Sequence, residues 1–316
     1  MFNFVHLHLH DEFSLLDGIG TPEQYCKKAK ELNYSVIGVT NHGNIDSFVQ
    51  FHKAGKKYGI KIIYGVETYI VPDLNVKEKG EKRGHLTIWI KDDIGYKNVL
   101  QMMSIANLYG FYYRPRIDYD LLLKHQNGLC IGTACINSFI YCDGGIDFLK
   151  KLMKANKDIY IELMPFNSEK QIVHNNKCLE LSEELKLPII CTNDVHFIEK
   201  EHKESHEVLL CIQSKDKMKN PDRWRFDVDG LFFCSPDYIY NAFVEQQVLT
   251  EEEIKQGMAN TIEIADKCEF EIKQKEITLP IPPQYKGMNE EDVLIDLCER
   301  GFEKRFGVKI DLRGYL

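Results

Sequence analysis

An α/β fold of the barrel type is predicted for this 316-residue chain by two features of its sequence. Short β-branched runs alternate with amphipathic helical stretches almost throughout, which is typical of βα units that share a parallel sheet. About seven of these runs have the character of strands, and that number favours one barrel over a pair of small domains. We therefore expect one barrel domain over residues 1–278.

The order of the elements follows from signals at their ends. Thr21, Pro22 and Gln24 begin the first helix, because they fit a capping box with proline in the first helical position. Further helices are expected at about 45–58 and within 95–110 and 169–186. The expected strands lie at residues 2–10, 35–40, 60–71, 85–90, 128–134, 159–164 and 187–194.

A change of composition marks the end of the barrel. The run Leu279-Pro280-Ile281-Pro282-Pro283 cannot lie in a helix or a central strand, so it is interpreted as a linker. Asn289 then caps one more helix. Because a lone helix beyond a linker has little to pack against, residues 279–316 are predicted to be a linker and the start of a following domain.

Composition excludes several classes of protein. Hydrophobic residues make up 44% and charged residues 28%, which is ordinary for a globular chain and excludes disorder. No apolar run reaches the ~18 residues of a membrane span, and the N-terminus has no signal-peptide features. Ten cysteines without a C-x-x-C pair indicate reduced thiols. We expect a soluble, cytoplasmic protein without a membrane partner. The net charge of −8 disfavours a nonspecific nucleic-acid coat, but it omits bound metal ions.

Three histidines near the N-terminus carry the first chemical signal. His6, His8 and His10 alternate with aliphatic residues, so on a strand their imidazoles would share one face and could reach a common metal ion. A merely polar strand face is the alternative, but Asp17 and two other acidic residues follow closely and favour a metal site. His6 is the weakest candidate, because it lies deepest in the predicted strand.

Other candidate ligands lie near the ends of predicted strands. In βα barrels the functional groups gather at the C-terminal ends of the strands, so residues distant in sequence would converge at one mouth. A mixture of imidazole, carboxylate and one thiolate suits zinc, manganese or iron better than calcium. These candidates are His42, Glu67, His85, Cys135, Asp194 and His196.

Several motifs resemble the PHP (polymerase and histidinol phosphatase) domain, namely FVHLHLHDEFSLLDG, VTNHGNI, GVETYI, HLTIWIKDDIGYKNVL, YGFYYRPRID and TNDVHF. SHEVLLCIQ and IEIADKCEFEI are further similar to the version of this domain at the N-terminus of bacterial replicative DNA polymerase III α subunits. The resemblance covers residues 2 to about 306. It implies a distorted (β/α)7 TIM-like barrel with a metal site at the C-terminal ends of the strands, followed by a polymerase domain.

The resemblance also implies up to three divalent metal ions, with zinc and manganese as the first candidates and iron or magnesium as alternatives. By the family pattern, His8, His10, Glu67 and Asp194 would bind one ion and carry the catalysis. The other two ions would be bound by Glu67, His85 and Cys135, and by Asp17, His42 and His196. All nine ligand types are present in this sequence.

Four positions depart from the family pattern. Asn41 stands where the family usually has Asp, which would deprive His42 of a charged partner. Asp11 replaces a common Thr, Phe197 replaces a common Tyr, and Ala134 stands where Gly is frequent. These changes bear on the tuning of the site rather than on its existence.

A metal cluster of this kind suits phosphodiester hydrolysis, because divalent ions offset the charge of the transition state and activate a water. The sequence therefore predicts a metal-dependent 3′→5′ exonuclease acting on DNA 3′ ends, and the resemblance implies a proofreading role. No PDxDxDF-like motif of a polymerase palm occurs, so DNA synthesis is not expected. Two alternatives remain: a phosphatase for small molecules such as histidinol phosphate, and a non-catalytic scaffold that metals stabilise.

Two basic stretches with aromatic residues, 112–116 and 215–225, are candidate DNA contacts, although ordinary solvated loops would have the same composition. The aromatic residue Trp224 could stack on a base. The expected partners are a DNA 3′ end and the rest of the polymerase, with a separate proofreading subunit or a sliding clamp as further candidates. The basic residues proposed to contact DNA are Arg114, Arg116, Lys217, Lys219, Arg223 and Arg225.

Overall fold

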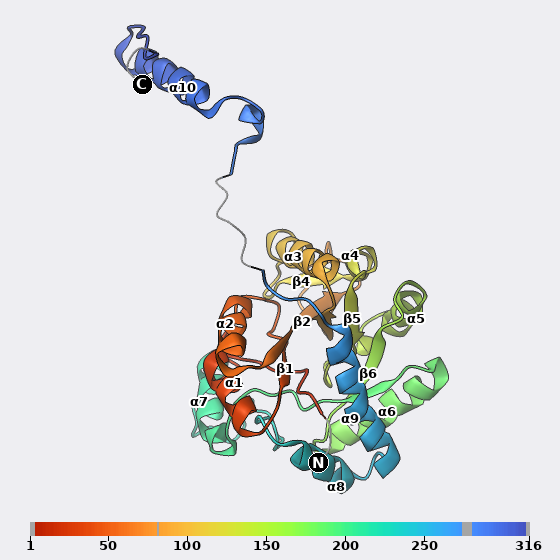
Figure 1. Ribbon diagram of the computed structural model, residues 1–316. Coiled ribbons are helices and arrows are strands. Elements are labelled where there is room, and N and C mark those ends of the chain that lie inside the picture. Colours follow the sequence, from red (N-terminus) through yellow and green to blue (C-terminus); the bar gives the residue numbers. More distant parts are fainter. Residues whose placement is uncertain (1–3, 81, 274–279, 314–316) are drawn as a thin grey trace. The chain divides into compact units, whose positions relative to one another are not determined.

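The structure, a computed structural model, describes residues 4–80, 82–273 and 280–313 (Figure 1). The chain divides into two compact units, Met1–Ile272 and Lys273–Leu316. The predicted boundary between residues 278 and 279 falls outside the described residues, so it stays a prediction.

Seven strands of the first unit form one curved sheet with helices around it (Figure 1). The strands follow each other in the order β1-β2-β3-β5-β6-β7, and β4 pairs with the far end of β2. Their bounds are β1 (Val36–Val39), β2 (Lys61–Val71), β3 (Gly84–Ile90), β4 (Arg116–Asp118), β5 (Leu129–Gly132), β6 (Ile159–Leu163) and β7 (Ile189–Cys191).

The N-terminal segment closes this sheet into a distorted barrel. The Gly38 N–H of β1 donates to the His6 carbonyl at 2.6 Å, and the His10 N–H donates to the Val195 carbonyl, just beyond β7, at 2.7 Å. The segment therefore lies between the two ends of the sheet. The predicted barrel architecture is confirmed.

Three details differ from the sequence prediction. β3 runs antiparallel to both of its neighbours, because no helix lies between β2 and β3 in the described residues to return the chain in parallel. β4 was not predicted. Residues 4–10 form no regular strand: beside their separate backbone hydrogen bonds, they have a single isolated β-bridge, from Leu9 to Val195. Residues 2 and 3 of the predicted strand lie outside the described part of the chain.

The helices match the predicted alternation. Thr21 caps the first of them through the expected capping box with Gln24, and Pro22 occupies its first turn. The helices are α1 (Pro22–Glu31), α2 (Phe48–Tyr58), α3 (Asp93–Leu108), α4 (Tyr119–His125), α5 (Gly145–Ala155), α6 (Glu169–Leu185), α7 (Lys203–Ser214), α8 (Pro236–Gln246), α9 (Glu251–Lys267) and α10 (Glu290–Phe306), with short 3-10 turns at Phe139–Tyr141, Lys200–His202 and Pro283–Tyr285.

Strand alternation separates the core into two layers and positions the site. Ile62, Tyr64 and Val66 of β2 belong to the large cluster of apolar side chains, whereas Ile63 belongs to a smaller cluster with Leu7, Trp89, Cys130 and Tyr160. The smaller cluster forms the floor of the barrel. Because side chains alternate along a strand, residues further along the inner face of β2, β3 and β6 lie above this floor. Those residues are polar: Glu67, Thr87 and Glu162, all buried.

The second unit contains α10. Its predicted cap is confirmed, because the Asn289 side chain accepts hydrogen bonds from the N–H groups of Glu291 and Asp292. Among the described residues of both units, no helix has the length and apolar character needed to cross a membrane.

Candidate metal centre

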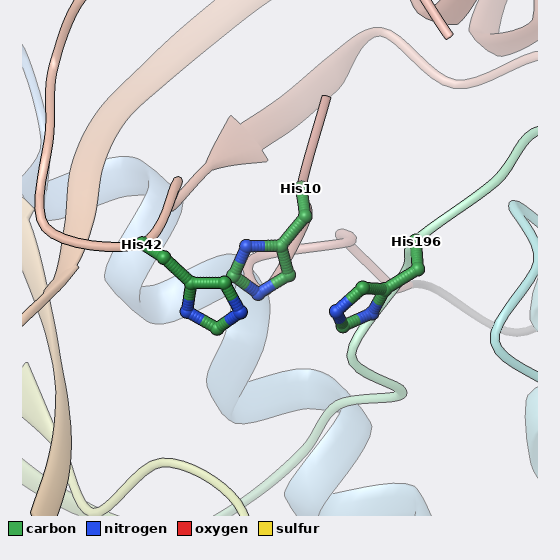
Figure 2. A group of neighbouring side chains, drawn as sticks. All are labelled: His10, His42 and His196. Atoms are coloured by element: carbon green, nitrogen blue, oxygen red, sulfur yellow. The ribbon is translucent and has the colours of Figure 1, made fainter. Parts of the chain in front are cut away.

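The nine predicted ligands come from seven segments of the chain and meet at the mouth of the barrel. Figure 2 shows three of them: His10 from the N-terminal segment, His42 from the loop after β1 and His196 from the segment after β7, with their rings turned toward one another. The ring centroid of His10 lies 4.1 Å from that of His42 and 4.5 Å from that of His196. His10 and His196 thus share one site although they are 186 positions apart in the sequence.

The first group of side chains surrounds Asp194. The Nε2 atoms of His8 and His10 lie 3.3 and 3.1 Å from its Oδ1. The same two nitrogens lie 3.4 and 3.6 Å from the two carboxylate oxygens of Glu67. His8, His10 and Asp194 offer ligand atoms that all lie within 4.8 Å of one another, which suits a single ion.

The second and third groups meet the first at Glu67. His85 Nδ1 lies 3.0 Å and Cys135 Sγ 3.8 Å from Glu67 Oε1. On the other side, His42 Nδ1 lies 2.6 Å from Glu67 Oε2, while its Nε2 lies 2.9 Å from Asp17 Oδ2. His196 Nε2 completes this side at 3.6 Å from Asp17 Oδ1. Glu67 is therefore the carboxylate that the three groups share.

Unpaired buried atoms test whether this cluster fits metal ions. A buried polar atom without a partner costs about 1–3 kcal/mol, so such atoms are rare in folded proteins. Seven occur together here, and none has hydrogen-bond geometry to any described residue. Divalent cations would satisfy all of them at once, so the donor set fits. The seven atoms are His8 Nε2, His10 Nε2, Asp17 Oδ1, His42 Nδ1, Glu67 Oε2, Asp194 Oδ1 and His196 Nε2.

The charges of the cluster are interlocked. Burial alone would raise the pKa of Glu67 and of Asp194, but the imidazoles around them lower both, so these carboxylates stay ionised at neutral pH. Burial lowers the pKa of His10 to about 3, with help from the neighbouring His42 and His196. Burial and the charge of Glu67 raise the pKa of the Cys135 thiol, which a coordinated cation would deprotonate. Ionised carboxylates and a neutral His10 are the forms that bind metals.

Glu162 is a functional residue that the sequence reasoning missed. Its Oε2 lies 2.9 Å from His8 Nδ1, which directs the opposite nitrogen of that ring at the cluster. The carboxylate is itself held by the hydroxyl groups of Thr87 and Thr192 and by the Ala134 N–H at 2.9 Å. The available signal was a single charged residue in the middle of an apolar predicted strand.

Ala134 explains one of the departures from the family pattern. Its φ of 58° lies in the left-handed region, where a glycine is free of strain. This conformation aims the Ala134 N–H at Glu162. The neighbouring Gly132 is required for a different reason, because a Cβ there would overlap the Glu162 carboxylate and the Thr87 hydroxyl.

Asn41 has a different role from the one expected. His42 has carboxylates against both ring nitrogens and lacks no charged partner. The Asn41 amide instead donates to Asp11 Oδ2 at 2.9 Å, and its oxygen accepts from the Ser14 hydroxyl at 2.9 Å. Ser14 Oγ in turn lies 3.0 Å from His10 Nδ1. The asparagine therefore orients His10 through Ser14.

This contact makes the departures at positions 11 and 41 interdependent, which gives a prediction. Asn41→Asp alone is expected to destabilise the fold by about 2 kcal/mol, because the buried Asp11 carboxylate loses a donor and faces a second carboxylate. Adding Asp11→Asn to the same chain lets the new Asn side chain donate to the new Asp side chain at position 41, which reverses the direction of the hydrogen bond. The double variant should therefore recover most of the lost stability. Urea unfolding of the wild type, the two single variants and the double variant measures the coupling free energy between positions 11 and 41. Additive effects of the two substitutions would contradict it.

The basic residues proposed to contact DNA differ in their exposure and in their partners. The prediction that Arg116 contacts DNA is wrong. Its side chain is fully buried, and its guanidinium donates to the carbonyls of Gly110, Val76 and Leu74. The charge of Arg223 is matched by an ion pair with Glu207. Lys217 and Lys219 are exposed.

The remaining two lie close to the cluster. Arg114 lies over the Tyr69 ring, 5.8 Å from its centroid, and Tyr69 stacks beside His42 at 5.9 Å. Arg225 lines a cavity of about 430 Å³ that also contacts Cys135 and Asp194. His6 lies outside the cluster: its two ring nitrogens face Asn193 Oδ1 and the Cys234 carbonyl, at 2.8 and 2.9 Å.

The sequence profile of the PHP domain family matches residues 6–184. The DNA polymerase III subunit alpha of Borreliella burgdorferi is 33% identical over 305 residues, which cover 91% of this chain and 26% of that protein. The subunit of the same name from Aquifex aeolicus is 33% identical over 325 residues, covering 96% of this chain and 28% of that protein. The chain spans about a quarter of the length of these curated relatives.

Solved structures show more distant similarity. A protein from Bifidobacterium adolescentis, proposed to be a metal-dependent phosphoesterase, has a TM-score of 0.44 and 12% identity, covering 61% of this chain and 87% of its own. Histidinol phosphate phosphatase from Lactococcus lactis, solved with zinc, L-histidinol and phosphate, has a TM-score of 0.34 and 14% identity, covering 69% and 95%.

Proposed function

Because the chain belongs to the PHP domain family, we propose that its metal centre hydrolyses phosphodiester bonds and acts as a 3′→5′ exonuclease on DNA 3′ ends. The observation that carries this proposal is the group of seven unpaired buried ligand atoms around Glu67. A cluster that gathers this many donors can hold several divalent ions side by side, which is the arrangement that phosphodiester hydrolysis uses.

The proposed role is proofreading within a larger replicative polymerase, because the curated relatives are polymerase subunits about four times as long. We expect this work in the cytoplasm, where such a polymerase would meet its DNA. A separate proofreading subunit and a sliding clamp are further candidate partners. The chain itself lacks a polymerase palm motif, so the proposed activity is hydrolysis alone.

The proposed ligands are the nine residues of the three groups, with Glu67 shared. Bound divalent ions would neutralise charge on the phosphate, lower the pKa of a water toward ~7 and align the attack in line. Zinc and manganese are the ions we propose, since imidazoles and one thiol accompany the carboxylates, with iron and magnesium as alternatives.

The surrounding residues orient the ligands. Glu162 accepts from His8 Nδ1 and Ser14 contacts His10 Nδ1, which leaves the Nε2 atom of each ring to face Asp194 and Glu67. Burial of all four of these ligands excludes bulk water from the cluster. The cavity that Cys135 and Asp194 line is the route by which we propose that the substrate phosphate reaches the cluster.

The test is hydrolysis of 5′-labelled oligonucleotides, single-stranded and 3′-recessed, with added manganese. We expect a ladder that shortens from the 3′ end for the wild-type chain and none for His8→Ala/His10→Ala. Histidinol phosphate runs beside the DNA as a monoester substrate. Hydrolysis of the monoester alone would favour the small-molecule phosphatase, and no hydrolysis by a metal-loaded chain would favour the scaffold.

A further inference from the structure

One cavity opens directly beside the metal centre. It measures about 430 Å³, within the ~300–1,000 Å³ range of small-molecule pockets. Cys135 and Asp194 form its inner wall, so a ligand in this cavity would reach the proposed metal ions. The rest of the lining is largely apolar, from Met164, Phe166, Phe226 and Leu231. A ligand that fits has a charged end at the metals and a flat or apolar body.

Aromatic rings lead outward from the metal centre along this cavity. The Phe226 ring lies 5.0 Å from that of His196 and is nearly parallel to the His206 ring, with an angle of 19° between them. Trp224 meets Phe226 edge to face at 5.1 Å. Phe226 is thus held between rings on the protein side, whereas Trp224 is 52% exposed. The row ends in a large aromatic face that is open to a ligand.

Resting on the proposed hydrolysis, we propose that Trp224 and Phe226 form the stacking platform for the unpaired 3′-terminal base of single-stranded DNA. A nucleotide fits this cavity, which has a polar wall and an aromatic wall. Its phosphate would lie at the wall formed by Cys135 and Asp194, and its base would lie against the rings of Trp224 and Phe226. Stacking on aromatic side chains accepts every base, as an exonuclease requires. A 3′-terminal base that is paired must first leave its partner and its stack to enter the cavity, which costs free energy, so the platform selects unpaired ends.

The charges around the opening agree with this orientation. Lys170 and Arg225 line the cavity, and neither makes an ion pair within the described part of the chain, so both are available to the next phosphates of the strand. Glu169 and Asp227 line the cavity as well, and their charge disfavours a phosphate beside them. The rings of Trp224 and Phe226 set the proposed position of the base.

Tryptophan fluorescence tests the platform directly. The chain has two tryptophans, and Trp89 is buried with its indole N–H donated to the Leu7 carbonyl, so quenching by DNA reports on Trp224. The probe is a 12-nucleotide single strand with phosphorothioate linkages at its 3′ end, which resist hydrolysis, titrated into the zinc-loaded chain. We expect strong quenching by the single strand and weak quenching by a blunt duplex of the same sequence.

Variants give a second readout through anisotropy of the labelled strand. Trp224→Ala is expected to weaken affinity roughly 5- to 100-fold, whereas Trp224→Phe keeps a stacking ring and stays within about threefold. Tyr109→Ala is the matched control, since Tyr109 is 69% exposed and does not line the cavity. Its affinity should equal that of the wild type.

The outcomes separate this proposal from the proposed hydrolysis. Binding without quenching, or wild-type affinity of Trp224→Ala, overturns the platform even if the chain degrades DNA. Quenching by the single strand together with weakened Trp224→Ala supports the platform even if no hydrolysis is seen. Absence of any DNA binding by the metal-loaded chain overturns the platform as well.

Discussion

Glu67→Gln is expected to lower metal-dependent hydrolysis by on the order of 1,000-fold, since losing the charge stabilisation of a metal cluster costs several kcal/mol in the transition state. The reason lies in the geometry: the two oxygens of Glu67 face His8, His10, His42 and His85, so one substitution affects all three groups. Gln keeps the size of the side chain, but it replaces one carboxylate oxygen with an NH2 group that cannot bind a cation, and it removes the negative charge.

The measurement is the rate of 3′-end shortening at saturating manganese, together with the number of ions bound after dialysis. Circular dichroism verifies that the variant is folded. Glu184→Gln serves as the matched control, because Glu184 is exposed and its one ion pair among the described residues is with Lys150. Should Glu67→Gln hydrolyse DNA at the wild-type rate, the cluster is not the catalyst, and the activity would have to come from elsewhere.

Removal of the metals is expected to lower the melting temperature by about 8 °C or more. An ion present at ~1,000 times its dissociation constant stabilises the native state by about 4 kcal/mol, and ~1 kcal/mol corresponds to about 2 °C for a chain of this size. The buried atoms of the cluster make this dependence specific to the site, since none of them has a hydrogen-bond partner among the described residues.

Calorimetry with and without a chelator measures the shift, and Glu67→Gln is the control that should lose most of it. Equal melting temperatures with and without chelator would contradict binding at the cluster. The melting shift alone does not separate a catalytic centre from a metal-stabilised scaffold. The two are separated by the hydrolysis assay, which makes the pair of measurements informative together.

Local signals determined much of what could be predicted. The alternation of histidines with leucines marked His8 and His10, and the D-x-H spacing after a predicted strand marked Asp194 and His196. Helix ends were equally readable, as at Thr21 and Asn289, because a cap depends on a few adjacent residues. Side-chain periodicity and capping are properties of short segments, so a sequence displays them directly.

Tertiary structure decided what depends on neighbours distant in sequence. Arg116 resembles a DNA contact until the carbonyls of Val76 and Leu74, about 40 positions away, surround its guanidinium. Glu162 becomes the partner of His8 only because β6 faces the N-terminal segment across the barrel. The direction of β3 and the role of Asn41 belong to the same class. Each depends on which side chains meet in the folded core, and such contacts leave no periodic trace along the chain.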